Sequence, residues 1–441
     1  MKDRTGNHVI NSIKAGFVTA CGVVVFLSVA GGFAAISQER LAKEEWWKRT
    51  REVAAGRYVL RCDLSRDEAG LVVGELNDTL RRGYEVVCGT LDSREQWPLL
   101  VWGFESRFDM MDAARTRQGA DVSNDVGRFV RGTSNKLIVI CGENQPQSMV
   151  RRVLRHEGFH QYAQKVFGGD LPWWLEEGLA ELFERAATVD GKAMFGEISA
   201  DDLQPMQIAV DQKKTTSLAA LMNLTEGEFK SSDSDTRDIL LGQAWLMAMW
   251  LANDPSGQRL ELLRGFLKNI NVGMGREEAT HRAFGDQTEA MDSAWRTWVL
   301  ELQPSALATA ADRMEFLAQG ATALAQSGTL AASLEDLRSK LVASDFSITE
   351  HVHAQVRIHS AKDGSMFELP VVVGSDARPE FVVERPNMAG RPKREQIEEQ
   401  KHPTPAVIRT QGLGGRELRV EWKWDEKEQG WHWGIKSVDA H

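Results

Sequence analysis

The chain has 441 residues, and its 53 Lys and Arg against 63 Asp and Glu give a formal net charge of −10 at pH 7, which disfavours nucleic-acid binding along the whole chain. Hydrophobic residues make up 42% and charged residues 26%, ordinary globular values that exclude wholesale disorder and low-complexity character. At roughly 150 residues per domain, the length allows two or three domains and excludes a short disulfide-stapled scaffold.

The N-terminal region contains one long uncharged segment. Residues 15–37 carry no charged side chain and, at about 1.5 Å per residue, are long enough to cross a hydrocarbon core of about 30 Å. We expect a tail over 1–14, a transmembrane anchor or signal segment over 15–37, and a charged stalk over 38–55. Cations flank both sides of this segment, but those of the stalk alternate with glutamates. We therefore expect a single-pass membrane protein with most of the chain outside the cytoplasm, or a secreted protein if residues 15–37 are cleaved.

The next part of the chain has the pattern of an α/β subdomain, over residues 56–145. Residues 57–63 predict a strand, and apolar positions at steps of three and four between 69 and 91 predict a long amphipathic helix. Short apolar runs at 97–104 and 136–141 predict two buried strands. Cys62 and Cys88 either remain buried thiols or form a disulfide. No GxGxxG or GxxxxGK[ST] motif follows these strands, so nothing here indicates a phosphate site.

The remaining chain divides into a helical part and a β-rich part. The apolar residues recur with a helical spacing over 146–302, and a further helical connector is expected over 303–343. Residues 344–441 predict a small β module that includes a hairpin over 417–438 and an exposed charged loop over 385–405. The tryptophans at 422, 424, 431 and 433 are typical of cross-strand packing, with a ligand platform as the alternative. This module could also bind a protein partner.

One short motif indicates chemistry. His156, Glu157 and His160 form an HExxH sequence inside a helical pattern. Residues four apart share one helix face, so the two histidines can bind one metal ion while Glu157, offset on the helix, holds a water beside it. Two imidazoles and a carboxylate suit Zn²⁺, which lowers the pKa of bound water to near 7 and polarises a carbonyl.

The third metal ligand is expected from the segment 171–183. Ala163 and Val166 exclude the metzincin extension HExxHxxGxxH, so this ligand does not follow the motif directly. Glu177 and Glu181 lie four apart on a predicted helix, and 16 residues between His160 and Glu177 allow the second helix to turn back alongside the first. We assign Glu177 as the metal ligand. We expect Glu181 to hydrogen-bond the outer nitrogen of a metal-bound histidine.

Two neighbouring residues are expected to play no part in this chemistry. Gln161 and Glu176 adjoin the motif residues in sequence but face elsewhere on their helices, so we interpret them as solvated or packing groups.

HEGFHQYA followed by PWWLEEGLAELFE resembles the gluzincin metallopeptidases, particularly the peptidase MA-like families of bacteria. The resemblance covers roughly residues 56–300 and implies an α+β fold. In it, a small α/β sheet packs on a mostly helical catalytic lobe, to which this chain adds the N-terminal membrane-spanning helix and the C-terminal small β module. It further implies one Zn²⁺ per chain, a peptide or protein substrate, Glu157 as general base, and a place in the bacterial cell envelope.

One feature of the gluzincin pattern is missing. Related sequences often place a tyrosine that hydrogen-bonds the oxyanion just before a Q-A-W segment, whereas Leu241 and Gly242 precede Gln243 here. Loss of one oxyanion donor typically costs about 10² to 10³ in rate. The alternative to a peptidase is therefore a catalytically inactive membrane-tethered binding or structural protein that retains a zinc site.

Overall fold

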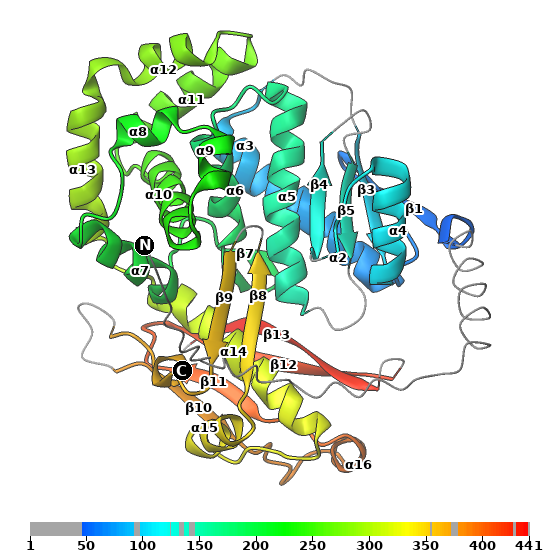
Figure 1. Ribbon diagram of the computed structural model, residues 1–441. Coiled ribbons are helices and arrows are strands. Elements are labelled where there is room, and N and C mark those ends of the chain that lie inside the picture. Colours follow the sequence, from blue (N-terminus) through cyan, green and yellow to red (C-terminus); the bar gives the residue numbers. More distant parts are fainter. Residues whose placement is uncertain are drawn as a thin grey trace, which may run out of the picture. The chain divides into compact units, whose positions relative to one another are not determined.

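The computed structural model describes residues 46–91, 98–123, 125–131, 136–140, 146–352, 355–371, 378–426 and 429–439. The chain divides into two compact units, Met1–Lys48 and Arg49–His441. The predicted tail over 1–14 and the segment over 15–37 lie outside the described residues. The second unit is shown in Figure 1 and carries every element discussed below.

The expected membrane-spanning helix requires a correction. In the part of the chain that the structure describes, no helix is long and apolar enough to cross a membrane. This finding contradicts the N-terminal membrane-spanning helix in the predicted fold class and the predicted single-pass membrane location. The described fold is mixed α+β. Its apolar helix α10 (Ser234–Ala252) begins with charged residues and is buried from Leu240 to Leu251, so its apolar surface belongs to the protein core.

A five-stranded sheet forms the first part of the unit. Its strands are β1 (Arg51–Ala55), β2 (Tyr58–Cys62), β3 (Leu99–Phe104), β4 (Gly127–Val130) and β5 (Lys136–Ile140), in the order β1-β2-β3-β5-β4. Strands β2, β3 and β5 are parallel, and β1 and β4 are antiparallel edge strands. Strand β1 lies within residues 38–55, where the sequence predicted a charged stalk.

The helices of this part follow the predicted periodicity with one interruption. The helices are α2 (Arg66–Thr79), the π-helical turn η1 (Leu80–Tyr84), α3 (Glu85–Cys88) and α4 (Arg107–Gln118). Ser65 and Glu68 form a capping box that starts α2. The predicted helix over 69–91 is thus one helical stretch with a π turn inside it. Cys62 and Cys88 are both buried free thiols, so the disulfide alternative is wrong.

The central region is helical. It contains α5 (Gln147–Phe167), α6 (Trp173–Glu184), the short strands β6 (Thr188–Val189) and β7 (Lys192–Ala193), α7 (Ala200–Asp211), α8 (Leu218–Asn223), α9 (Glu226–Ser231), α10, α11 (Gln258–Asn271), α12 (Arg276–Phe284), η2 (Gly285–Gln287) and α13 (Thr288–Glu301). Helix α6 packs against both α5 and α10. A Cβ on Gly178 would lie 2.3 Å from the Ala244 carbonyl oxygen, so glycine permits the close approach of α6 and α10.

The C-terminal part has its own core. It consists of α14 (Ala306–Gln326), α15 (Leu334–Ala343), β8 (Ser347–Val352), β9 (Gln355–Ser360), η3 (Gly364–Phe367), β10 (Glu380–Glu384), α16 (Lys393–Lys401), β11 (Val407–Gln411), β12 (Arg416–Asp425) and β13 (Gly430–Asp439). Strands β10 to β13 form an antiparallel sheet in chain order, and α14 packs against it. The predicted hairpin over 417–438 is confirmed. The predicted loop over 385–405 contains α16.

Candidate metal centre

Two histidines of α5 point their ring nitrogens at each other. His156 and His160 are four residues apart, and their Nε2 atoms are 3.1 Å apart. Their side chains are 1% and 6% exposed. Helix α5 can place them so because its apolar surface is buried nearly all round, between the sheet and α6. The i, i+4 spacing of the motif therefore produces one inward-facing pair of nitrogens.

Glu177 completes a three-residue group on the facing helix. Its Oε2 lies 3.8 Å from His156 Nε2 and 3.7 Å from His160 Nε2. Gly168, in the left-handed conformation, ends α5, and Pro172 precedes α6, so the chain reverses sharply between the two helices. Donor atoms held at about 2.0–2.1 Å from a tetrahedral Zn²⁺ would be about 3.4 Å apart. The three observed separations and the N, N, O donor set fit such an ion.

Glu157 lies beside this group and contacts the sheet. Its Oε2 accepts a hydrogen bond of 2.8 Å from the backbone N–H of Phe129 in β4. Strand β4 is the last strand of the sheet, and it packs against α5. The edge of β4 that faces away from β5 therefore points toward Glu157. The carboxylate expected to act as general base is thus held by a strand that the sequence did not connect with it.

The outer nitrogens of both histidines meet carboxylates of α6. His156 Nδ1 is 2.8 Å from Glu184 Oε2, and His160 Nδ1 is 3.0 Å from Glu176 Oε1. Such carboxylates favour the tautomer with a proton on Nδ1, in which the lone pair of Nε2 could bind a metal ion. Sequence reasoning assigned neither role and interpreted Glu176 as a packing or solvated group. Glu184 follows Glu177 by seven residues, two helical turns, so its position on the same face was an available signal.

Glu181, which the sequence assigned to this role, is held by arginines. Arg185 contacts Glu181 at 2.6 Å and Asp202 at 2.6 Å. Arg357 of β9 lies 3.8 Å from Glu181 and 3.4 Å from Asp202. One oxygen of Glu181 is nevertheless within 4.8 Å of potential ligand atoms of His156 and Glu184. Glu181 therefore joins the histidine pair to a buried charged cluster behind it.

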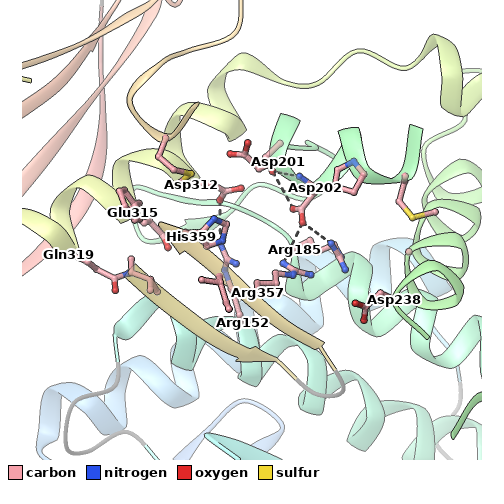
Figure 2. A pocket seen from close by; sticks show the side chains of 18 residues that line it. Arg152, Arg185, Asp201, Asp202, Asp238, Asp312, Glu315, Gln319, Arg357 and His359 are labelled. Carbon is pink, nitrogen blue, oxygen red and sulfur yellow. Dashed lines mark hydrogen bonds and ion pairs between the residues drawn. The ribbon is translucent and has the colours of Figure 1, made fainter. Parts of the chain in front are cut away.

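A cavity of about 280 Å³ lies at this charged cluster (Figure 2). The view shows Arg185 and Arg357 both directed at Asp202, and Arg152 paired with Asp312. The cavity is lined by residues of α5, α7, α10, α14 and β9. It contains none of His156, His160 and Glu177. The cavity therefore lies where the C-terminal part contacts the helical region, and two pairs, Arg357 with Asp202 and Arg152 with Asp312, cross that contact.

The electrostatics of the histidine pair favour a cation. Burial alone would lower the pKa of His156. The hydrogen bond and charge of Glu184, together with the charges of Glu157 and Glu177, outweigh this effect and raise the pKa to about 10. Several buried carboxylates thus surround one imidazole. The negative charge that they concentrate requires compensation by a proton or by a metal ion.

The three tyrosines of the chain lie in the described part and are buried in the core away from this site. The Tyr84 hydroxyl donates to the Arg155 carbonyl oxygen at 2.5 Å, and the Tyr162 ring packs against Tyr84. Leu241, which precedes Gly242 and Gln243, is fully buried in α10.

Comparisons with known proteins give two similarities. Residues 152–269 match the model of a family described as a protein of unknown function, DUF1570. This range includes both histidines, Glu157 and Glu177. No curated protein matches the chain. Among solved structures, the chain is similar to native yeast LTA4 hydrolase at 13% identity and a TM-score of 0.33, over 66% of this chain and 45% of that one. The chain thus spans less than half the length of that hydrolase.

Proposed function

We propose that the protein is a zinc-dependent peptidase. The observation that supports this proposal is the convergence of His156 Nε2, His160 Nε2 and Glu177 Oε2 within 3.8 Å of one another, with Glu157 beside them. These three residues would hold Zn²⁺. The ion would polarise the scissile carbonyl and make water a stronger nucleophile near neutral pH.

The residues around the metal site would transfer protons, orient the histidine ligands and bind the peptide. Glu157 would accept the proton of the attacking water and pass it to the leaving amine nitrogen. A site that only stabilised the fold would not need a carboxylate directly after its first histidine. Glu184 and Glu176 would orient the two imidazole rings through Nδ1. The open edge of β4, whose Phe129 N–H reaches Glu157, offers backbone groups to an extended peptide.

The test of this proposal separates metal binding from hydrolysis. Elemental analysis of the purified full chain should find about one zinc per molecule, and Glu177→Ala should retain much less. Glu157→Gln should retain zinc but lose about 10² to 10⁴ in kcat/KM against a quenched-fluorescent peptide library. Glu261→Gln, the same chemical change at an exposed position on α11, is the matched control and should behave as wild type.

Two outcomes would contradict the proposal. If the folded wild type binds no zinc when it is supplied, the three residues are not a zinc site. If zinc binds but wild type and Glu157→Gln are equally inactive against the library, the ion has a structural role.

A further inference from the structure

The C-terminal part forms one wall of a groove of about 1010 Å³. The opposite wall comes from Val126, the first turns of α5 and the β6–β7 turn, while α14, β8 and β13 contribute the C-terminal side. Gln147 to Arg151, at the start of α5, lie about 8–14 Å before His156 along the helix axis at 1.5 Å per residue. The groove therefore approaches the candidate metal centre without including it.

Strand β13 turns an open edge toward this groove. It is the last strand of its sheet, and its outer edge is held at one end by the β6–β7 turn. There the Asp190 N–H donates to the Ile435 carbonyl oxygen at 2.9 Å, and the Ser437 N–H donates to the Asp190 carboxylate at 3.1 Å. Ile435 and Ser437 thus direct their backbone N–H and C=O groups outward, away from β12. In an antiparallel strand every second residue does so, and Trp433 and Trp431 therefore also direct their backbone groups outward.

The outward backbone groups of Trp431 and Trp433 are available for pairing. The register of β13 with β12 is continuous from Gly430 to Asp439, so no bulge reverses the alternation. Within the described residues, neither tryptophan makes a backbone hydrogen bond on this outer edge. Both residues line the groove. Two N–H and two C=O groups there can receive an added strand.

The groove is continuous with the edge strand of the other sheet. Phe129 directs its N–H outward from β4 to Glu157, so Gly127, two residues earlier, faces the same edge. Val126 follows next toward the N-terminus and lines the groove. A peptide that passes Glu157 along β4 therefore reaches the groove within about three residues, or about 10 Å. The groove, at about 1010 Å³, lies at the upper end of the roughly 300–1,000 Å³ range of small-molecule pockets, so it has room for several residues of a peptide.

We infer that this groove holds an extended stretch of the polypeptide substrate, several residues from the scissile bond, by adding it as a strand to β13. The inference rests on the proposed peptidase function and narrows its substrate class. The enzyme would act on long, unfolded or extended chains in preference to peptides of a few residues. The Trp431 and Trp433 rings would add apolar contacts to the backbone pairing.

Two positions on the groove wall allow it to be filled without disturbing the core. Ala323 lies on the exposed surface of α14 and lines the groove. A Cβ on Gly434 of β13, which also lines the groove, would meet no atom within 4 Å. Ala323→Trp and Gly434→Trp therefore add bulk from two sides. Ala220→Trp, on the exposed surface of α8 and outside the groove, is the matched control.

The experiment measures peptide binding separately from hydrolysis. Fluorescein-labelled random peptides of 20 and of six residues are titrated with the zinc-loaded full chain carrying Glu157→Gln, and anisotropy gives Kd. Each groove variant should weaken binding of the 20-residue peptides at least tenfold more than binding of the six-residue peptides. The control should bind both lengths as its parent does.

Other results would overturn the inference. An equal loss for both lengths, or no loss for the long peptides, would mean that the groove does not hold substrate. A change in molecular mass by light scattering in the groove variants alone would mean that a second copy of the chain occupies it. If the length-dependent loss is found but the wild type cleaves no peptide, the groove stands as an extended-peptide site and the peptidase proposal fails.

Discussion

Replacing Glu184 by alanine tests which carboxylate positions the first histidine. Glu184 is fully buried, and its Oε2 lies 2.8 Å from His156 Nδ1. Alanine would leave that nitrogen buried at 1% exposure with its main acceptor removed, and the ring would be free to rotate. Glu181, the residue that the sequence favoured for this role, is instead held at 2.6 Å by Arg185.

The expected magnitude follows from the position of Glu184 behind a ligand. Loss of a carboxylate that hydrogen-bonds a metal-bound histidine typically costs 10- to 100-fold in metal affinity, equivalent to about 1.4–2.7 kcal/mol. Glu184→Gln keeps an oxygen that can accept from Nδ1–H, so its loss should be smaller. Glu181→Ala should mainly lower thermal stability, because it removes a buried partner of Arg185.

The assay is zinc affinity, measured by competition with a chromophoric chelator at fixed pH. Circular dichroism and thermal unfolding of each metal-free variant distinguish a changed site from a misfolded chain. The reasoning is refuted if Glu184→Ala binds zinc as tightly as wild type. A large loss of zinc affinity in Glu181→Ala, with none in Glu184→Ala, would restore the assignment made from the sequence.

Three further predictions concern stability. Gly178→Ala should lower the melting temperature and zinc affinity together, because the new Cβ would force α6 away from the Ala244 carbonyl; equal melting temperatures would contradict this. Glu75→Gln should cost about 3–5 kcal/mol by urea denaturation, since it leaves the fully buried Arg155 short of its 2.6 Å partner. Burial alone would raise the pKa of Glu75, but the charges of Arg155 and Arg151 outweigh this effect and hold the pKa below its ordinary value of 4.5. The contribution of the ionised Glu75 to the free energy of unfolding is therefore present above pH 4.5 and is lost as pH falls through the lowered pKa. Burial raises the pKa of Asp312 to about 8, so the free energy of unfolding should fall as pH rises from 3.8 to 8, and Asp312→Asn should flatten that slope.

Local patterns predicted the parts of the site that lie on single helices. The i, i+4 spacing places His156 and His160 on one face of α5, because the geometry of a helix fixes this arrangement independently of how the helix packs. Glu177 could be expected opposite them because the 16 residues between His160 and Glu177 allow the second helix to turn back alongside the first. The β12–β13 hairpin was likewise predictable from alternation over 417–438 and a turn near 426–430.

Periodicity could not choose between the two candidate carboxylates on α6. Glu181 and Glu184 follow Glu177 by four and seven residues, and at 100° per residue both lie within about 40° of its direction. In the folded chain Glu184 Oε2 lies 2.8 Å from His156 Nδ1, whereas Arg185 contacts Glu181 at 2.6 Å. Glu176 reaches His160 although it precedes Glu177, because the first turn of α6 lies beside the second histidine.

The sequence by itself therefore determined that His156, His160 and Glu177 come together, because their placement depends on backbone geometry within one helix and one helical hairpin. Only the tertiary structure decided which groups support those atoms. Phe129 lies 28 residues from Glu157 along the chain, and Arg357 belongs to a hairpin of the C-terminal part, yet each contacts a carboxylate at the site. The open edges of β4 and β13 also lie near one groove only after folding. Contacts at such separations depend on how whole layers pack, and no local period encodes that packing.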